Sequence, residues 1–143
     1  MSRENLESSF SRLRETSFEI TSEETIDYNC IAWAAGDTER WWWPGGYFWP
    51  DNAPDGVSQK TFLDTFMKMG FEICKNGDIE SGFEKIALYV DDDKQPTHMA
   101  RQLPNGKWTS KCGRLEDISH DLEGLEGPAY GRVTYFLRRL LSP

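Results

Sequence analysis

The sequence has no long hydrophobic run. A membrane-spanning helix needs about 20 consecutive apolar residues, and no stretch of this 143-residue chain approaches that length. The first residues, MSRENLESSF, are polar where a secretory signal peptide would be apolar. We therefore expect a cytoplasmic protein.

Basic residues are also few. The chain has 16 Lys and Arg against 24 Asp and Glu, which gives a net charge of −8 and an isoelectric point near 4.8. Such a charge repels the phosphates of nucleic acids and of anionic lipids. We expect neither nucleic acid nor a membrane as a partner, and the sequence does not predict an oligomeric state.

Cysteine is scarce and widely spaced. Cys30, Cys74 and Cys112 are odd in number and lie outside any C-x-x-C spacing, so neither a disulfide framework nor a structural zinc site is expected. The acidic run DDDK at residues 91–94 lacks the D-x-D-x-D-G spacing of a calcium loop. The sequence therefore predicts reduced thiols and no bound metal.

The best-marked catalytic and nucleotide-binding motifs are missing too. The chain contains no G-x-x-x-x-G-K-[ST], G-x-G-x-x-G, H-E-x-x-H or G-x-S-x-G, which argues against the best-marked nucleotide-binding proteins, zinc proteases and serine hydrolases. No cofactor is expected. A hypothesis built on a cysteine nucleophile consequently has few competitors.

The chain has the length of one domain, residues 1–143, and is too short for two ordinary ones. Periodic apolar residues predict a short helix over Asn5–Arg14 and a helix over Gln59–Met69 with Ser58 as its N-cap. A further short helix is expected within Leu115–Leu125. Alternating patterns predict five strands: Phe71–Lys75, Lys85–Val90, His98–Leu103, Lys107–Cys112 and Tyr130–Arg139. This order predicts an α+β fold, with N-terminal helices on an antiparallel sheet of about five strands.

One cysteine opens an unusually apolar segment, DYNCIAWAAGD. Residues 31–35 carry no polar side chain apart from the indole nitrogen, so a helix built from them should be buried. Cys30 then lies in the first turn, where unpaired N–H groups and the helix dipole favour a thiolate. The alternative is that Cys30 is a small buried hydrophobic residue, as free cysteines commonly are.

A base for this thiol has to come from two histidines. His98 opens a predicted strand, and the following LPNGKW predicts a three-residue hairpin loop with Gly106 in the left-handed bulge position. That register pairs Ala100 with Ser110 and places Ser110 diagonally to His98, where its hydroxyl can hold one imidazole nitrogen. A two-residue turn would instead put Thr109 and Lys111 on this face. His120, among acidic residues, is the reserve base.

The two motifs YNCIAWAA and THMARQL, in this order along the chain, resemble the papain-like fold in its NlpC/P60 form. The resemblance covers about residues 26–139 and implies Cys30 as the nucleophile, His98 as the base and Ser110 in the third position. Papain-like folds usually have His, Asn or Asp there, so Ser110 departs from the pattern. The resemblance also implies Tyr28 as a donor to an oxyanion, and Asn29 stands where the family motif has Asp.

The aromatic segment WWWPGGYFWPDNAPDG, Trp41–Gly56, is predicted to be an extended loop that packs on its own rings. Within it, Trp43 and Trp49 are candidates for a substrate groove, and Trp108 on the strand after the hairpin is a third. A packed loop under the central helix is the simpler interpretation for most of these rings.

Two functional hypotheses follow from these observations. In the first, the protein is a cysteine-dependent amide hydrolase or acyl transferase: Cys30 attacks a carbonyl of a peptide or other amide, Tyr28 or Asn29 helps to stabilise the oxyanion, and His98 protonates the leaving amine. In the second, the same scaffold is a non-catalytic module that holds a peptide or glycan with its Trp-rich loop.

Overall fold

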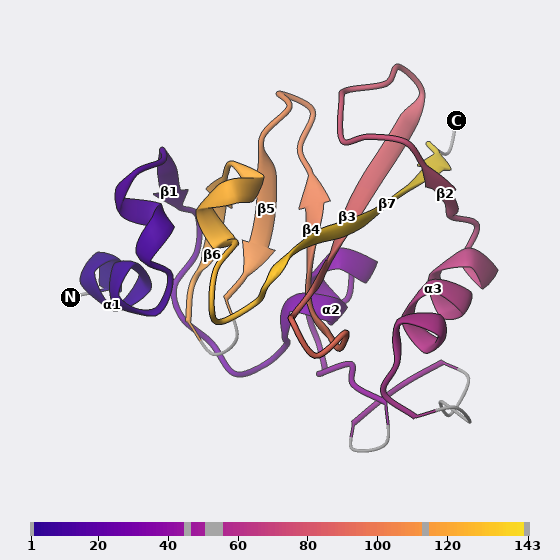
Figure 1. Ribbon diagram of the computed structural model, residues 1–143, viewed down its shortest axis with the longest axis horizontal. Coiled ribbons are helices and arrows are strands. Elements are labelled where there is room, and N and C mark those ends of the chain that lie inside the picture. The colour runs from indigo at the N-terminus through magenta and orange to yellow at the C-terminus, as the bar shows by residue number, and fades with distance from the viewer. Residues whose placement is uncertain (1, 45–46, 51–55, 113–114, 142–143) are drawn as a thin grey trace.

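The computed structural model describes residues 2–44, 47–50, 56–112 and 115–141, and its architecture is α+β as predicted (Figure 1). The strands form one sheet in the order β1-β6-β5-β4-β3-β7-β2, and every neighbouring pair in it is antiparallel. The strands are β1 Phe18–Ile20, β2 Glu72–Cys74, β3 Phe83–Val90, β4 Pro96–Gln102, β5 Trp108–Lys111, β6 Asp117–His120 and β7 Arg132–Leu140.

The helices are short and lie near the predicted positions. The first predicted helix is split into α1, Ser2–Ser9, and a 3-10 turn η1, Ser11–Arg14. The cysteine-bearing segment forms α2, Cys30–Ala35. The third helix, α3, spans Gln59–Lys68, and its N-cap is the predicted Ser58, whose hydroxyl accepts from the backbone N–H of Thr61. None of the helices within the described residues is long and apolar enough to cross a membrane.

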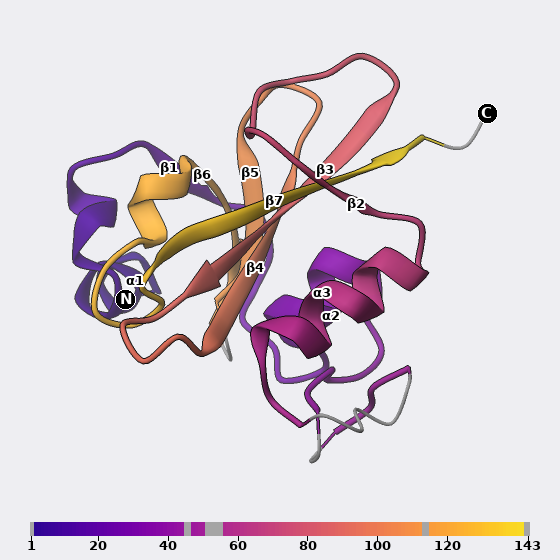
Figure 2. The same ribbon diagram turned by 45° about the vertical axis from the view of Figure 1, so that its right-hand side comes forward.

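Helices cover both faces of the sheet (Figure 2). Alternation along β3 divides the core, because Ile86 and Leu88 pack with α2 and α3 whereas Ala87 and Tyr89 pack with α1 and η1. We call these the α2 face and the α1 face. The apolar residues predicted on the first helix, Leu6, Phe10 and Leu13, are buried on the α1 face.

The sheet has seven strands rather than about five. The additional strands are β1 and β6, which pair with each other from Phe18↔His120 to Ile20↔Ile118. The short helix predicted within Leu115–Leu125 is present as a 3-10 helix, η2 Leu122–Leu125, and the unpredicted strand β6 precedes it in the same segment. Each strand is too short for its alternation to be recognised without its partner.

The predicted hairpin loop between β4 and β5 is confirmed. The backbone N–H of Leu103 donates to Lys107 O at 2.7 Å, and the N–H of Gly106 donates to Leu103 O at 3.0 Å. Gly106 has φ +91°, the left-handed value that the bulge position requires. The paired residues of β4 and β5 are Arg101↔Thr109 and Gln102↔Trp108. These two pairs have the predicted register. The predicted pair of Ala100 with Ser110 is not among them, because β4 and β5 are not paired from His98 to Ala100.

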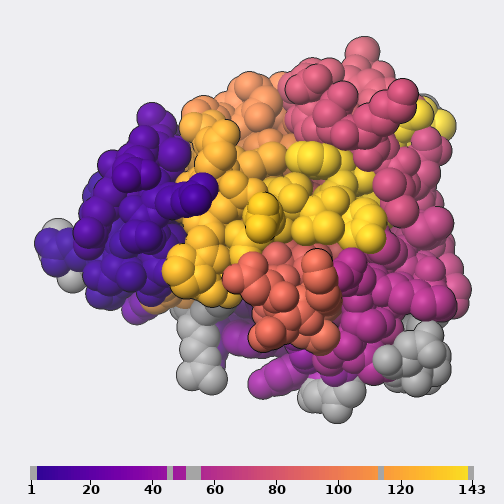
Figure 3. All heavy atoms as spheres, viewed as in Figure 1, coloured from indigo at the N-terminus to yellow at the C-terminus, as the bar shows by residue number. Residues whose placement is uncertain are grey.

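The last strand, β7, is inserted between β3 and β2 rather than added at an edge. Its residues run across the middle of the face seen in Figure 3, with the N-terminal segment at one side. The sheet is therefore completed by the final residues of the chain.

The aromatic segment packs against the helices of the α2 face, except for residues 45–46 and 51–55, which lie outside the described residues. Trp42 and Trp49 are buried, and Trp43 and Phe48 pack against the same cluster. The indole N–H of Trp49 donates to Thr65 Oγ1 at 2.9 Å. A packed loop is thus confirmed for these rings.

Candidate functional site

His98 lies on β4 and is completely buried. Its ring points to the α1 face, where it stacks on Tyr130 with 4.1 Å between ring centroids and meets the edge of Tyr89. His98 Nε2 is 2.9 Å from Ser110 Oγ. The contact that the hairpin register predicted between the histidine and this serine is present.

Ser110 also contacts the second histidine. Its Oγ is 2.7 Å from His120 Nε2, and His120 Nδ1 is 2.8 Å from the carbonyl oxygen of Asp121. Both Ser110 and His120 are fully buried. The structure therefore joins His98, Ser110 and His120 into one chain of side chains, with the role of His120 missed by the sequence analysis because β6 was not recognised as a strand.

Both imidazoles are neutral at pH 7. Burial lowers the pKa of His98 well below its usual value, and the nearby His120 lowers it further. Burial also lowers the pKa of His120 to about 4, although its contact with the backbone of Asp121 opposes that shift. A neutral imidazole has one N–H and one lone pair, so each ring nitrogen in this chain has a definite role.

The other ring nitrogen of His98, Nδ1, is buried and has no hydrogen-bond partner within the part of the chain that the structure describes. Buried polar atoms without partners are uncommon in native proteins, because each one has lost its water without replacement. Nε2 of His98 thus contacts Ser110, whereas Nδ1 has no hydrogen-bond partner.

Cys30 opens α2, as expected. Asn29 is the N-cap: its side-chain oxygen accepts from the N–H of Ala32 at 3.1 Å. Burial raises the pKa of the Cys30 thiol to about 11, and hydrogen bonding from the backbone of Met99, Ile31 and Cys30 itself only partly opposes the rise. The expected lowering by the helix start is therefore outweighed by desolvation, and the resting thiol is protonated.

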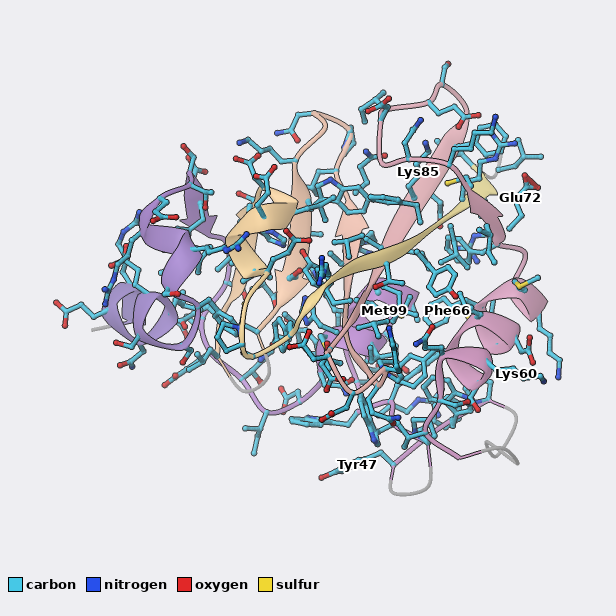
Figure 4. The ribbon with its side chains drawn as sticks, in the orientation of Figure 1. Tyr47, Lys60, Phe66, Glu72, Lys85 and Met99 are labelled. Atoms are coloured by element: carbon cyan, nitrogen blue, oxygen red, sulfur yellow. The ribbon has the colours of Figure 1, made fainter. Side chains whose placement is uncertain are left out.

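Within the described residues no hydrogen bond joins Cys30 to His98, because His98 Nε2 contacts Ser110 and Nδ1 has no partner. The thiol packs with Met99, the residue after His98, on the α2 face, and α2 contacts both β4 and β5. Met99 is labelled in Figure 4 beside α2. A charge on Cys30 would also raise the pKa of Tyr130, whose ring covers His98. The thiol and the imidazole leave opposite faces of the sheet, at the end where β4 and β5 are no longer paired.

The two residues considered as oxyanion donors are both engaged elsewhere. The Tyr28 hydroxyl donates to Asp117 Oδ2 at 2.6 Å, and burial together with this contact raises the pKa of Tyr28 to about 12. The Asn29 amide donates to Trp42 O at 2.9 Å while its oxygen accepts from Trp42 N–H. Neither side chain is therefore free to donate to an oxyanion in this arrangement.

The three tryptophans considered for substrate binding occupy different places. Trp49 is buried between α3 and the aromatic segment, and Trp108 is buried on the α1 face beside Phe136. Trp43 is half-buried and meets the edge of Phe62 at 5.4 Å. The structure does not bring these rings together around Cys30.

A buried charged group that the sequence analysis did not single out lies near Cys30 on β5 and β6. Lys111 pairs in register with Asp117, and both are almost completely buried. Lys111 Nζ donates to Leu115 O at 2.5 Å and lies over the Tyr28 ring. Its positive charge opposes the rise in the pKa of Cys30. Among the described residues no cluster of His, Cys, Asp or Glu is arranged to hold a metal ion.

Comparison with known proteins gives one relationship. No curated protein matches the chain and no solved structure matches it. A family model described as a domain of unknown function, DUF7689, matches residues 19–138. This segment contains most of β1, all of β2 to β6, the cysteine-bearing helix, both histidines and most of β7. Since the match spans well over half of the chain, the protein belongs to the DUF7689 domain family.

Proposed function

We propose that this protein is a cysteine-dependent amide hydrolase or acyl transferase in which Cys30 is the nucleophile and His98 the general base. The observation that carries the proposal is the state of His98: Ser110 holds Nε2, while Nδ1 is buried and unpartnered. An imidazole with one nitrogen anchored and the other open is what a general base requires.

The resting pair is neutral, so the thiol proton moves only during attack. As Cys30 Sγ bonds to the carbonyl carbon of the amide, His98 Nδ1 takes the thiol proton. The same nitrogen then gives it to the leaving amine when the C–N bond breaks, which leaves an acyl-enzyme. Water, or an acceptor amine in a transferase, releases the acyl group and restores the thiol. Backbone N–H groups at Cys30 stabilise the oxyanion, because the Tyr28 and Asn29 side chains are occupied.

The reaction requires Sγ and Nδ1 to come within hydrogen-bond distance. The unpaired stretch between β4 and β5 is the place where a thiol from the α2 face can meet the His98 ring. Catalytic hydrogen bonds are often long before substrate binds and tighten in the reacting complex.

We also propose that the fold is papain-like and related to NlpC/P60 enzymes. The support is the cysteine that opens α2, the packing of α2 on β4 and β5, and the histidine near the start of β4. The substrate class is a peptide or another amide. A net charge of −8 disfavours nucleic acids and anionic membranes as partners, and a cytoplasmic location fits three unpaired thiols.

Alkylation by iodoacetamide tests the pair without a known substrate. We expect Cys30 to be labelled faster than both Cys112 and Cys74 in the folded protein at pH 7, and to lose this advantage in His98→Ala. Cys112 is the matched internal control, because it is equally buried and has its pKa raised mainly by burial. Equal, slow labelling of Cys30 and Cys112, unchanged in His98→Ala, would refute the catalytic pair.

A binding module is the second candidate, and one observation favours it. Tyr47 is 60% exposed and its ring lies 5.4 Å from that of Trp41; Figure 4 shows it pointing away from the molecule. Such a pair can stack on an apolar or sugar face. Quenching of tryptophan fluorescence by chito-oligosaccharides or peptides, abolished in Tyr47→Ala and retained in Cys30→Ala, would support binding without catalysis. No response to either ligand would argue against it.

A further inference from the structure

The chain of buried side chains behind His98 has a definite direction of hydrogen bonding, and this direction can be read from its far end. A carbonyl oxygen can only accept. His120 Nδ1, at 2.8 Å from Asp121 O, must therefore carry the proton of that ring. Since His120 is neutral, its Nε2 has the lone pair and acts as the acceptor.

The direction of the hydrogen bonds at Ser110 follows from that of His120. Its hydroxyl has a single proton, and the bare His120 Nε2 at 2.7 Å receives it. At its other contact, 2.9 Å away, Ser110 Oγ must then accept a proton from His98 Nε2. A neutral His98 protonated at Nε2 has its lone pair on Nδ1, the nitrogen without a partner.

We infer that His120 is a positioning residue: it sets the tautomer of His98 through Ser110, so that the lone pair lies on Nδ1, the nitrogen without a hydrogen-bond partner. The catalytic consequence rests on the function proposed above, whereas the tautomer assignment does not. Without His120, the Ser110 hydroxyl is free to donate to His98 Nε2. The His98 proton then moves to Nδ1, and the base is lost.

Other side chains enclose the chain of His98, Ser110 and His120, and all three residues are fully buried. The rings that enclose His98 also have their own contacts. The Tyr89 hydroxyl donates to Leu122 O at 2.9 Å, and Tyr130 presents its ring face to the imidazole.

The position of His120 follows from the strand register. Ser110 pairs with Ile118 and Trp108 pairs with His120, so Ser110 and His120 are diagonal neighbours on the α1 face. His98 is in turn diagonal to Ser110 across the β4–β5 boundary. Three adjacent strands each contribute one member, and any shift by one residue would break the chain.

The test is a nitrogen-15 NMR spectrum of the histidine rings at pH 7. The chain has only two histidines, and we expect opposite tautomers: Nδ1–H in His120 and Nε2–H in His98. His120→Gln, which leaves His98 as the only ring, assigns the signals. Its side-chain oxygen can still accept from Ser110, whereas His120→Leu provides no acceptor.

We expect His98 to remain Nε2–H in His120→Gln and to shift toward Nδ1–H in His120→Leu. In parallel, iodoacetamide labelling of Cys30 should slow by about 10-fold or more in His120→Leu and largely recover in His120→Gln. A wild-type spectrum with the same tautomer in both rings would overturn the inference, even if the variants do not fold. So would an unchanged His98 tautomer in His120→Leu. A tautomer shift with no change in labelling would uphold the inference and refute the proposed catalytic pair instead.

Discussion

Acid should destabilise this protein through its two buried histidines. The pKa of His120 is about 4 in the folded state, against about 6.5 in an unfolded chain. Between these values the unfolded chain binds a proton that the folded protein does not. The free energy of unfolding therefore has its full value above about pH 6.5 and falls as the pH drops from 6.5 toward 4.

The size of this effect follows from the two pKa values. From pH 7 to pH 5, His120 alone should lower the free energy of unfolding by about 2 kcal/mol. Burial also lowers the pKa of His98 well below its usual value, so His98 should add to this loss in the same direction. The contribution of His120 alone is already a large part of the 5 to 15 kcal/mol typical of a small domain.

Urea unfolding followed by tryptophan fluorescence at pH 7 and pH 5 measures this loss. In His120→Gln, which removes this titrating group, the difference between the two pH values should be about 2 kcal/mol smaller than in the wild type. Ser119→Ala is the matched control: it lies on the same strand, does not titrate, and should leave the pH difference unchanged. A His120→Gln protein with the full wild-type pH difference would show that His120 is not held neutral by burial.

Three further changes have definite expected outcomes. Tyr28→Phe removes the donor to the buried Asp117 carboxylate and should lower the free energy of unfolding by about 1.5–3 kcal/mol in urea; a loss below 0.5 kcal/mol, on the order of a surface change, would contradict this. Gly131→Ala places a β-carbon 2.1 Å from a backbone oxygen of β3 at φ +80°. Gly131→Ala should lower the stability of the folded protein by more than Gly82→Ala does. Gly82 has a similar φ and open space around it, so its substitution should cost only about 1–2 kcal/mol. Equal losses of stability in thermal unfolding would show that the contact at Gly131 is relieved. Under the proposed pair of Cys30 and His98, Ser110→Ala should slow alkylation of Cys30 less than His98→Ala does, since Ser110 would orient the base rather than supply it; an equal loss would place Ser110 in the chemistry itself.

The local parts of this structure were predictable because their signals are local. Ser58 and the apolar stripe defined α3, and the turn LPNG fixed the register that brings Ser110 to His98. The two missed strands depend on each other across about a hundred residues of sequence, from Phe18 to His120. Neither shows a periodicity of its own, since each is only three or four residues long.

The properties of Cys30 and His120 could not be predicted from the sequence, because they depend on burial and on neighbouring strands. The sequence placed Cys30 at a helix start, which favours a thiolate, but it could not weigh that effect against burial, which raises the pKa to about 11. His120 was read as one polar residue in an acidic segment. Its partners become visible only when β6 is placed beside β5, so its position behind Ser110 could not be inferred without the sheet.

The insertion of β7 between β3 and β2 determines when this protein can finish folding. Strand β2 pairs only with β7 among the described strands, as in Glu72↔Arg138, and one edge of β3 stays open until β7 arrives. A nascent or truncated chain that ends before Arg132 therefore exposes an apolar strand edge that can pair with another molecule. Closing contacts between residues so distant in sequence is also slow. The interval between synthesis of β3 and synthesis of β7 is thus the period in which this protein is most exposed to aggregation and most dependent on chaperones.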